Sequence, residues 1–171
     1  VYKRSGGTYI TDGSDINSER YRAYGVAVGD VDNDGEAEIA VGTGSFGDSK
    51  PTVSVYDGSS HSLEYTRTVD TSSVWGVAID DFDSDGFVEL VYGTSGGEVF
   101  LYDGETEDFE SKTSALSGKA GHYGGIAIGN LDDEGPKEML IGSEVYLWLF
   151  TCLLYTSDAA DEASLCISRW S

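Results

Sequence analysis

The sequence predicts an all-β protein built from repeats of about 50 residues. Three similar segments begin at Tyr24, Trp75 and Gly124. Within them, short runs rich in Val and Ile are bounded by Gly, Asp or Ser, which is the punctuation of β-strands. No segment carries a sustained stripe of apolar residues at helical spacing.

Each repeat contains several short strands in a fixed order. In the first repeat the strands are expected at 25–28, 38–41, 53–56 and 63–69. In the second repeat they are expected at 76–79, 89–92, 99–102 and 109–116. Four short strands and a period near 50 residues are typical of a β-propeller blade. The predicted fold class is therefore all-β, a partial β-propeller of four-stranded antiparallel blades.

The repeats also predict the domain organisation. Two full blades are expected at 22–73 and 74–121, between the end of a truncated blade at 1–21 and the start of another at 122–151. The segment 152–171 is similar to a translated sequencing adapter, and we expect it to be a non-native tail outside the fold. Both cysteines lie in this segment, so the rest of the chain predicts no disulfide and no thiol chemistry.

The composition is strongly acidic, with 31 Asp and Glu against 10 Lys and Arg and a formal net charge of −21. Such a charge repels nucleic acids and anionic membranes, and it suits cation binding or a salt-adapted surface. The apolar run 145–155 is too short to insert into a membrane. His61 and His122 lie in no catalytic pattern, and no nucleophile motif is present, so we expect no enzyme activity.

Each repeat carries an acidic loop between its first two strands: DVDNDGEAE from Asp30, DFDSDGFVE from Asp81 and NLDDEGPKE from Asn130. Carboxylates at positions 1, 3 and 5 of a tight turn point inward, and Gly at position 6 allows a positive φ. A backbone carbonyl at position 7 and a carboxylate at position 9 complete a shell of hard oxygen ligands, which Ca²⁺ prefers. Position 12, the closing Glu of the helical calcium loop, is here an apolar strand residue. Without an ion, the clustered carboxylates are expected to raise their own pKa values.

The pattern therefore predicts two calcium sites and a weaker third one. The first site consists of Asp30, Asp32, Asp34, Glu36 and Glu38, and the second of Asp81, Asp83, Asp85, Phe87 and Glu89. The weaker site consists of Asn130, Asp132, Glu134, Pro136 and Glu138.

The repeats resemble the FG-GAP repeat, also called the VCBS-type or integrin-α-like repeat. The resemblance rests on Tyr24-Gly25, the acidic loop and the run 42–44, and Trp75-Gly76 repeats it. It implies a propeller of seven or a similar number of blades, of which this chain holds about three, with Ca²⁺ in the loops of one face. Three features depart from the family pattern: Gly44 is not followed by Pro, the third loop is altered, and the closing acid is Glu.

The resemblance also implies an extracellular or cell-surface module for adhesion, or for binding protein or carbohydrate. The ligand is expected on the face opposite the calcium loops, through 43–51, 70–74, 94–97 and 117–124. One alternative is an accessory propeller domain of an extracellular enzyme such as a polysaccharide lyase. Another is a quinone-type or WD-like propeller, which leaves the acidic loops unexplained.

Overall fold

The structure is a computed structural model, and it describes most of the chain up to residue 151. The described residues are 2–5, 8–11, 22–44, 50–69, 73–84, 86–104, 106, 108–113, 116–118, 120–122, 125–144 and 146–151. Every regular element in these ranges is a β-strand, which confirms the all-β prediction. The segment 152–171 lies outside the described residues.

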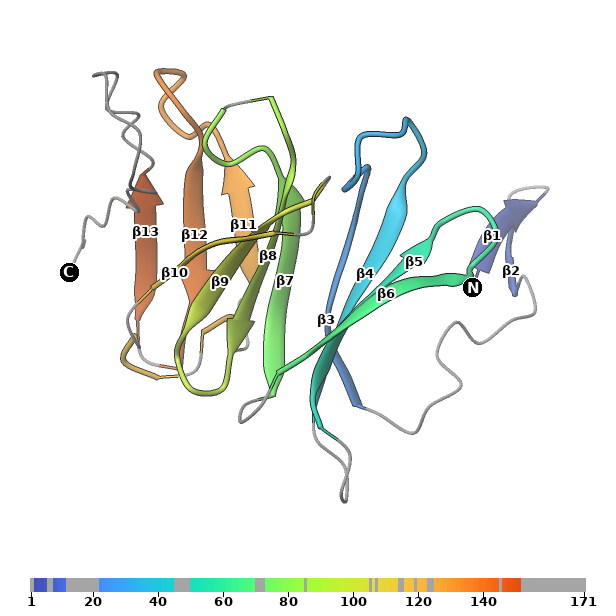
Figure 1. Cartoon of the computed structure of the whole chain (residues 1–171), viewed down its shortest axis with the longest axis horizontal. Coiled ribbons are helices and arrows are strands. Elements are labelled where there is room, and N and C mark those ends of the chain that lie inside the picture. Colours follow the sequence, from blue (N-terminus) through green and yellow to red (C-terminus); the bar gives the residue numbers. More distant parts are fainter. Residues whose placement is uncertain are drawn as a thin grey trace.

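The strands form a two-stranded hairpin and three larger antiparallel sheets (Figure 1). The hairpin pairs β1 (Tyr2–Ser5) with β2 (Thr8–Thr11). The first large sheet contains β3 (Arg22–Gly29), β4 (Glu38–Gly44), β5 (Thr52–Asp57) and β6 (Leu63–Thr68). The second contains β7 (Val74–Asp80), β8 (Glu89–Thr94), β9 (Val99–Asp103) and β10 (Phe109–Lys112). The third contains β11 (Ile126–Gly129), β12 (Glu138–Gly142) and β13 (Leu147–Thr151).

Each large sheet is a meander in which neighbours in sequence are neighbours in space. The order is β3-β4-β5-β6 in the first sheet, β7-β8-β9-β10 in the second and β11-β12-β13 in the third. These are the successive blades of a partial propeller, as predicted. A total of seven blades and the exact limits of the repeats stay predictions.

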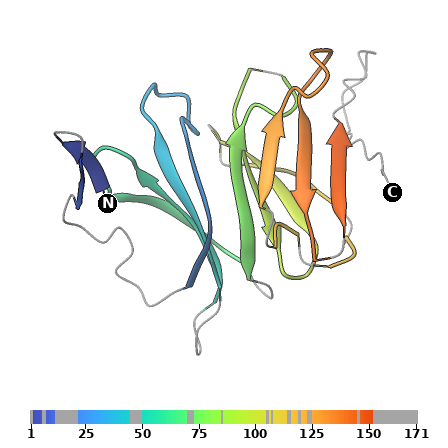
Figure 2. The same ribbon diagram turned by 180° about the vertical axis from the view of Figure 1, so that it is seen from behind.

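The second sheet lies between the other two (Figures 1 and 2) and shares one apolar core with each. Because side chains alternate along a strand, Leu90 and Tyr92 face the first sheet, while Val91 faces the third. The near-continuous apolar run of β8 follows from this double burial, and all six of its residues are buried.

Glycines on one sheet make room for side chains of the next. A Cβ at Gly42 would lie 2.6 Å from a methyl group of Val74 and 2.9 Å from one of Val77. A Cβ at Gly76 would lie 2.9 Å from the Ile126 side chain. Since real Cβ atoms do not approach so closely, these glycines are required by the packing between sheets.

The outer faces of the first and third sheets are partly uncovered. Val26 and Val28 on β3 are 67% and 66% exposed, and Leu147 on β13 is 62% exposed. The positions equivalent to Val26 and Val28 in the second repeat, Val77 and Ile79, lie in or against the first core. These side chains are therefore exposed because no further sheet packs on these faces among the described residues.

Candidate metal centre

The acidic loops occupy equivalent places in the three large sheets. Each loop, at 30–37, 81–88 or 130–137, joins the first strand of its sheet to the second. All three loops lie at the same end of the sheets, the upper end in Figure 1.

The loops share an unusual backbone. At position 6 the φ angles of Gly35, Gly86 and Gly135 are 93°, 98° and 65°. The positive φ expected at this glycine is therefore present in all three loops. Position 4 also adopts positive φ in each loop, at Asn33, Ser84 and Asp133. Sequence analysis missed this second reversal, although Asn and Asp are among the residues that tolerate it.

Carboxylate side chains hold the first loop in shape by accepting backbone hydrogen bonds. The amide of Gly35 donates to Asp30 Oδ2 at 3.0 Å. The amide of Asp34 donates to Asp32 Oδ1 at 3.2 Å, and the amide of Glu36 donates to Asp34 Oδ1 at 2.8 Å. These bonds occupy one oxygen of each aspartate and turn the loop around a common centre.

The glutamate at position 9 is buried in every loop. Glu38 and Glu89 are 1% exposed and Glu138 is 6% exposed. In each case its Oε2 accepts a hydrogen bond from the amide at position 2, from Val31, Phe82 or Leu131. This bond ties the loop to the start of the second strand, and sequence analysis missed it. The only hint in the sequence was that position 2 is apolar in each loop, at Val31, Phe82 and Leu131.

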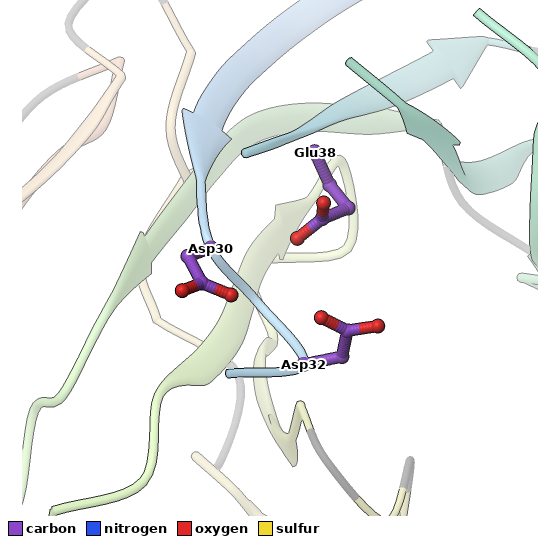
Figure 3. A group of neighbouring side chains, drawn as sticks. All are labelled: Asp30, Asp32 and Glu38. Atoms are coloured by element: carbon purple, nitrogen blue, oxygen red, sulfur yellow. The ribbon is translucent and has the colours of Figure 1, made fainter. Parts of the chain in front are cut away.

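Two carboxylate clusters form at the predicted places. Oxygens of Asp30, Asp32 and Glu38 lie within 4.8 Å of one another, and Figure 3 shows the three side chains around one centre. Oxygens of Asp81, Asp83 and Glu89 form the same arrangement in the second loop. Three anionic oxygens at this separation are the donor set of a hard divalent cation.

The environment of the aspartate at position 1 suits a cation. Asp30 Oδ1 and Asp81 Oδ1 are buried and accept no hydrogen bond from the described residues. A buried carboxylate oxygen with no donor is costly, and a bound cation removes that cost. In the first loop the other oxygen, Asp30 Oδ2, is already used by Gly35, so Oδ1 is the atom left for an ion.

The surroundings of Glu38 shift the pKa of its carboxyl group. Burial raises the pKa of the Glu38 carboxyl above its ordinary value of 4.5, and the carboxylates of Asp32, Glu64 and Asp34 raise it further. The hydrogen bond from the Val31 amide acts in the opposite direction. For Glu38 the direction is as expected, but the largest cause is burial rather than repulsion.

The third loop differs. Among the described residues it contains no group of three acidic side chains at this separation, because Asn130 replaces the aspartate at position 1. Lys137, at position 8, instead forms an ion pair with Asp80 at the end of β7, at 2.5 Å. A lysine of the third sheet therefore lies beside the second acidic loop.

For several residues of the predicted sites, the role as a calcium ligand stays a prediction. Asp34 and Glu36 lie outside the group formed by Asp30, Asp32 and Glu38. Asp85 lies outside the described residues. The roles assigned to Phe87, Asn130, Asp132, Glu134, Pro136 and Glu138 also stay predictions.

The comparisons with known proteins agree with this architecture. Residues 23–62, which contain the first acidic loop, match the FG-GAP repeat family. The predicted resemblance to the FG-GAP repeat is thereby confirmed for this segment. No curated protein matches the chain.

Solved structures share the fold at low sequence identity. A chain in "Crystal structure of an active polycomb repressive complex 2 in the basal state" matches with a TM-score of 0.57 and 9% identity. The match covers 82% of this chain and 29% of that chain. This likeness concerns the fold alone. In the described part of the chain, no helix is long and apolar enough to cross a membrane.

Proposed function

We propose that the chain is a calcium-stabilised propeller module of a secreted or cell-surface protein, acting in adhesion or in binding protein or carbohydrate rather than in catalysis. The observation that carries this proposal is the cluster of Asp30, Asp32 and Glu38, in which Asp30 also has a buried oxygen, Oδ1, that accepts no hydrogen bond from the described residues. The same arrangement recurs at Asp81. The recurrence of this arrangement at equivalent positions of two repeats supports a common role for both loops.

The donor chemistry favours calcium. Only oxygen atoms converge on the two clusters, and histidine and cysteine take no part. Carboxylates together with backbone carbonyls and water provide the six to eight flexible ligands that Ca²⁺ takes. Extracellular modules bind Ca²⁺ with a Kd of roughly 0.1 to 1 mM, and an affinity in this range suits the proposed location.

The fold indicates what a bound ion would stabilise. The residue after the first aspartate in each site, Val31 or Phe82, is 0% or 2% exposed and belongs to a core between two sheets. Gly104 of the second sheet approaches the Val31 carbonyl so closely that an added Cβ would clash with it. Fixing the loop therefore fixes the side chain and the backbone against which the next blade packs.

A thermal melt tests this proposal directly. The full chain is melted in 2 mM Ca²⁺, in 2 mM Mg²⁺ and in EDTA, beside Asp30→Asn, which keeps an acceptor for Gly35 but removes the charge. With a Kd of roughly 0.1 to 1 mM, 2 mM Ca²⁺ contributes about 0.6–1.8 kcal/mol per site, which is about 1–7 °C for a chain of this size. We expect calcium to raise the melting temperature and Asp30→Asn to lose roughly half of that rise.

The matched control is Asp108→Asn, an exposed carboxylate at another turn. It is expected to keep the whole calcium response. An unchanged melting temperature of the folded wild-type chain across all three buffers would contradict the proposal.

A further inference from the structure

A cavity lies near the starts of β3, β7 and β11, at the end of these strands that is opposite the acidic loops. It has a volume of about 410 Å³ and is lined by residues of all three large sheets. Tyr24, Trp75 and Ile126 lie near the starts of β3, β7 and β11, whereas the acidic loops follow the ends of these strands. A strand rises about 3.3 Å per residue, so roughly 20 Å separates Tyr24 from Asp30.

One wall of the cavity is aromatic. The rings of Tyr24 and Trp75 stack, with centroids 4.1 Å apart and planes inclined by 23°. The ring of His122 meets Trp75 edge-on, with centroids 4.2 Å apart. Tyr24 ends this row and is 38% exposed, so part of its side chain is open to a ligand. Because the row is held from several sheets, it is a rigid platform rather than a single mobile side chain.

The same wall has a polar end. His122 is 6% exposed, and its Nδ1 lies 3.5 Å from Glu144 Oε1. The ring of this buried histidine, which packs edge-on against Trp75, presents its hydrogen-bonding atoms at fixed positions. An entirely apolar occupant would desolvate this polar end without replacing its hydrogen bonds, which is costly.

The lack of charged side chains in the described lining of the cavity indicates which class of ligand it could bind. Among the described residues that line it, none is Lys, Arg, Asp or Glu. An anionic ligand would find no counter-charge there, and the strongly acidic chain would repel it. A cationic ligand would find no carboxylate among the described lining residues either. The cavity is suited to a neutral molecule with both an apolar face and hydroxyl groups.

We propose that this cavity binds a neutral saccharide, with the C–H face of one sugar ring on Tyr24 and its hydroxyl groups directed to the His122 end. The volume lies within the range of sites for small molecules, which combine apolar walls with a few fixed polar groups. A Cβ on Gly125 would meet nothing within 4 Å, so the backbone at this edge is open to a hydroxyl group. This inference deepens the proposed function, because it names the ligand class and the site of the binding module.

The test uses the full chain in calcium, and the probe is a printed panel of neutral and of sialylated or sulfated oligosaccharides. The best neutral oligosaccharide is then titrated by calorimetry against wild type, Tyr24→Ala, Tyr24→Phe and Phe109→Ala. We expect at least a tenfold loss of affinity for Tyr24→Ala and less than a threefold loss for Tyr24→Phe, which keeps the ring. Phe109 is 53% exposed on the outermost strand, away from the cavity, and its replacement should leave binding unchanged.

Circular dichroism and the calcium-dependent melt are recorded for every sample. A folded, calcium-responsive chain that binds no neutral oligosaccharide would overturn the saccharide site and leave the calcium proposal intact. Selective binding of the acidic oligosaccharides would overturn it as well. So would neutral binding that survives Tyr24→Ala at full strength.

Discussion

The first two acidic loops and the third one start from similar sequences and reach different environments. Val31 and Phe82, at position 2 of the first two loops, are 0% and 2% exposed, whereas the equivalent Leu131 is 59% exposed. Carboxylate clusters form in the first two loops and not, among the described residues, in the third. Positive φ at positions 4 and 6 and the hydrogen bond from the amide of position 2 to the glutamate are nevertheless present in all three.

This difference distinguishes the properties that depend on the sequence of a loop from those that depend on the neighbouring sheet. The turn and the buried glutamate depend on residues of the loop alone. The burial of position 2 depends on the next sheet, and the cluster depends on the aspartate at position 1, which Asn130 replaces. Packing between blades and cation binding are therefore two separate properties of one loop.

The largest expected effect concerns position 2. Phe82→Ala removes a buried aromatic side chain from the second core and should cost about 3–5 kcal/mol of unfolding free energy. Leu131→Ala removes an exposed side chain and should change the stability by less than about 0.5 kcal/mol. Urea unfolding of both variants measures the difference. Similar losses would mean that Leu131 is packed as Phe82 is.

The turn glycines should differ by a smaller amount. Ala at Gly35 must adopt a φ near 93°, outside the left-handed region open to other residues, and should cost about 2 kcal/mol. Ala at Gly135, with φ of 65°, lies inside that region and should cost about 1 kcal/mol. Neither Cβ would meet an atom within 4 Å, so the comparison isolates the backbone. Chemical denaturation in EDTA tests the order, and a larger loss at Gly135 would contradict it.

Restoring the missing carboxylate should bring the third loop closer to the others. Asn130→Asp supplies an acidic residue at position 1 beside Asp132 and Glu138. At calcium ten times Kd, a new site would contribute about 1.4 kcal/mol, seen as a larger calcium-dependent rise in melting temperature. If the calcium response of Asn130→Asp equals that of wild type, the missing aspartate is not what separates the loops.

The smallest expected effect is a pH dependence in the first loop. Because the pKa of Glu38 is raised in the fold, its protonated form stabilises the metal-free protein below the ordinary value of 4.5. That contribution is lost as the pH rises through the raised pKa. Glu38→Gln should therefore melt higher than wild type at pH 7 in EDTA and gain less from calcium. A lower melting temperature for Glu38→Gln in EDTA would mean that the ionised Glu38 stabilises the metal-free protein, contrary to this prediction.

Much of the architecture was predictable because blades repeat. The spacing of Gly25, Gly76 and Gly125 and the strand-like runs between turns predicted the sheets and the order of their strands. The positive φ of Gly35 was predictable from the need to reverse the chain around an ion.

Two features were not predictable, for physical reasons. The hydrogen bond from the Val31 amide to Glu38 depends on how closely the loop returns to its second strand, which residue spacing does not fix. The aromatic row of Tyr24, Trp75 and His122 joins residues of different repeats, so its geometry depends on the angle between sheets. Sequence reasoning favoured a packing role for these aromatic residues, and the cavity beside them became visible only in the assembled sheets.

We infer that the first two loops hold cations and that the third does not. Calorimetric titration of the chelator-treated full chain with Ca²⁺ tests it most directly, with Asp30→Asn and Asp81→Asn titrated beside wild type. We expect two calcium ions per wild-type chain and one per chain for each variant. Three ions, or none in a folded sample, would contradict it, as would an unchanged stoichiometry in either variant.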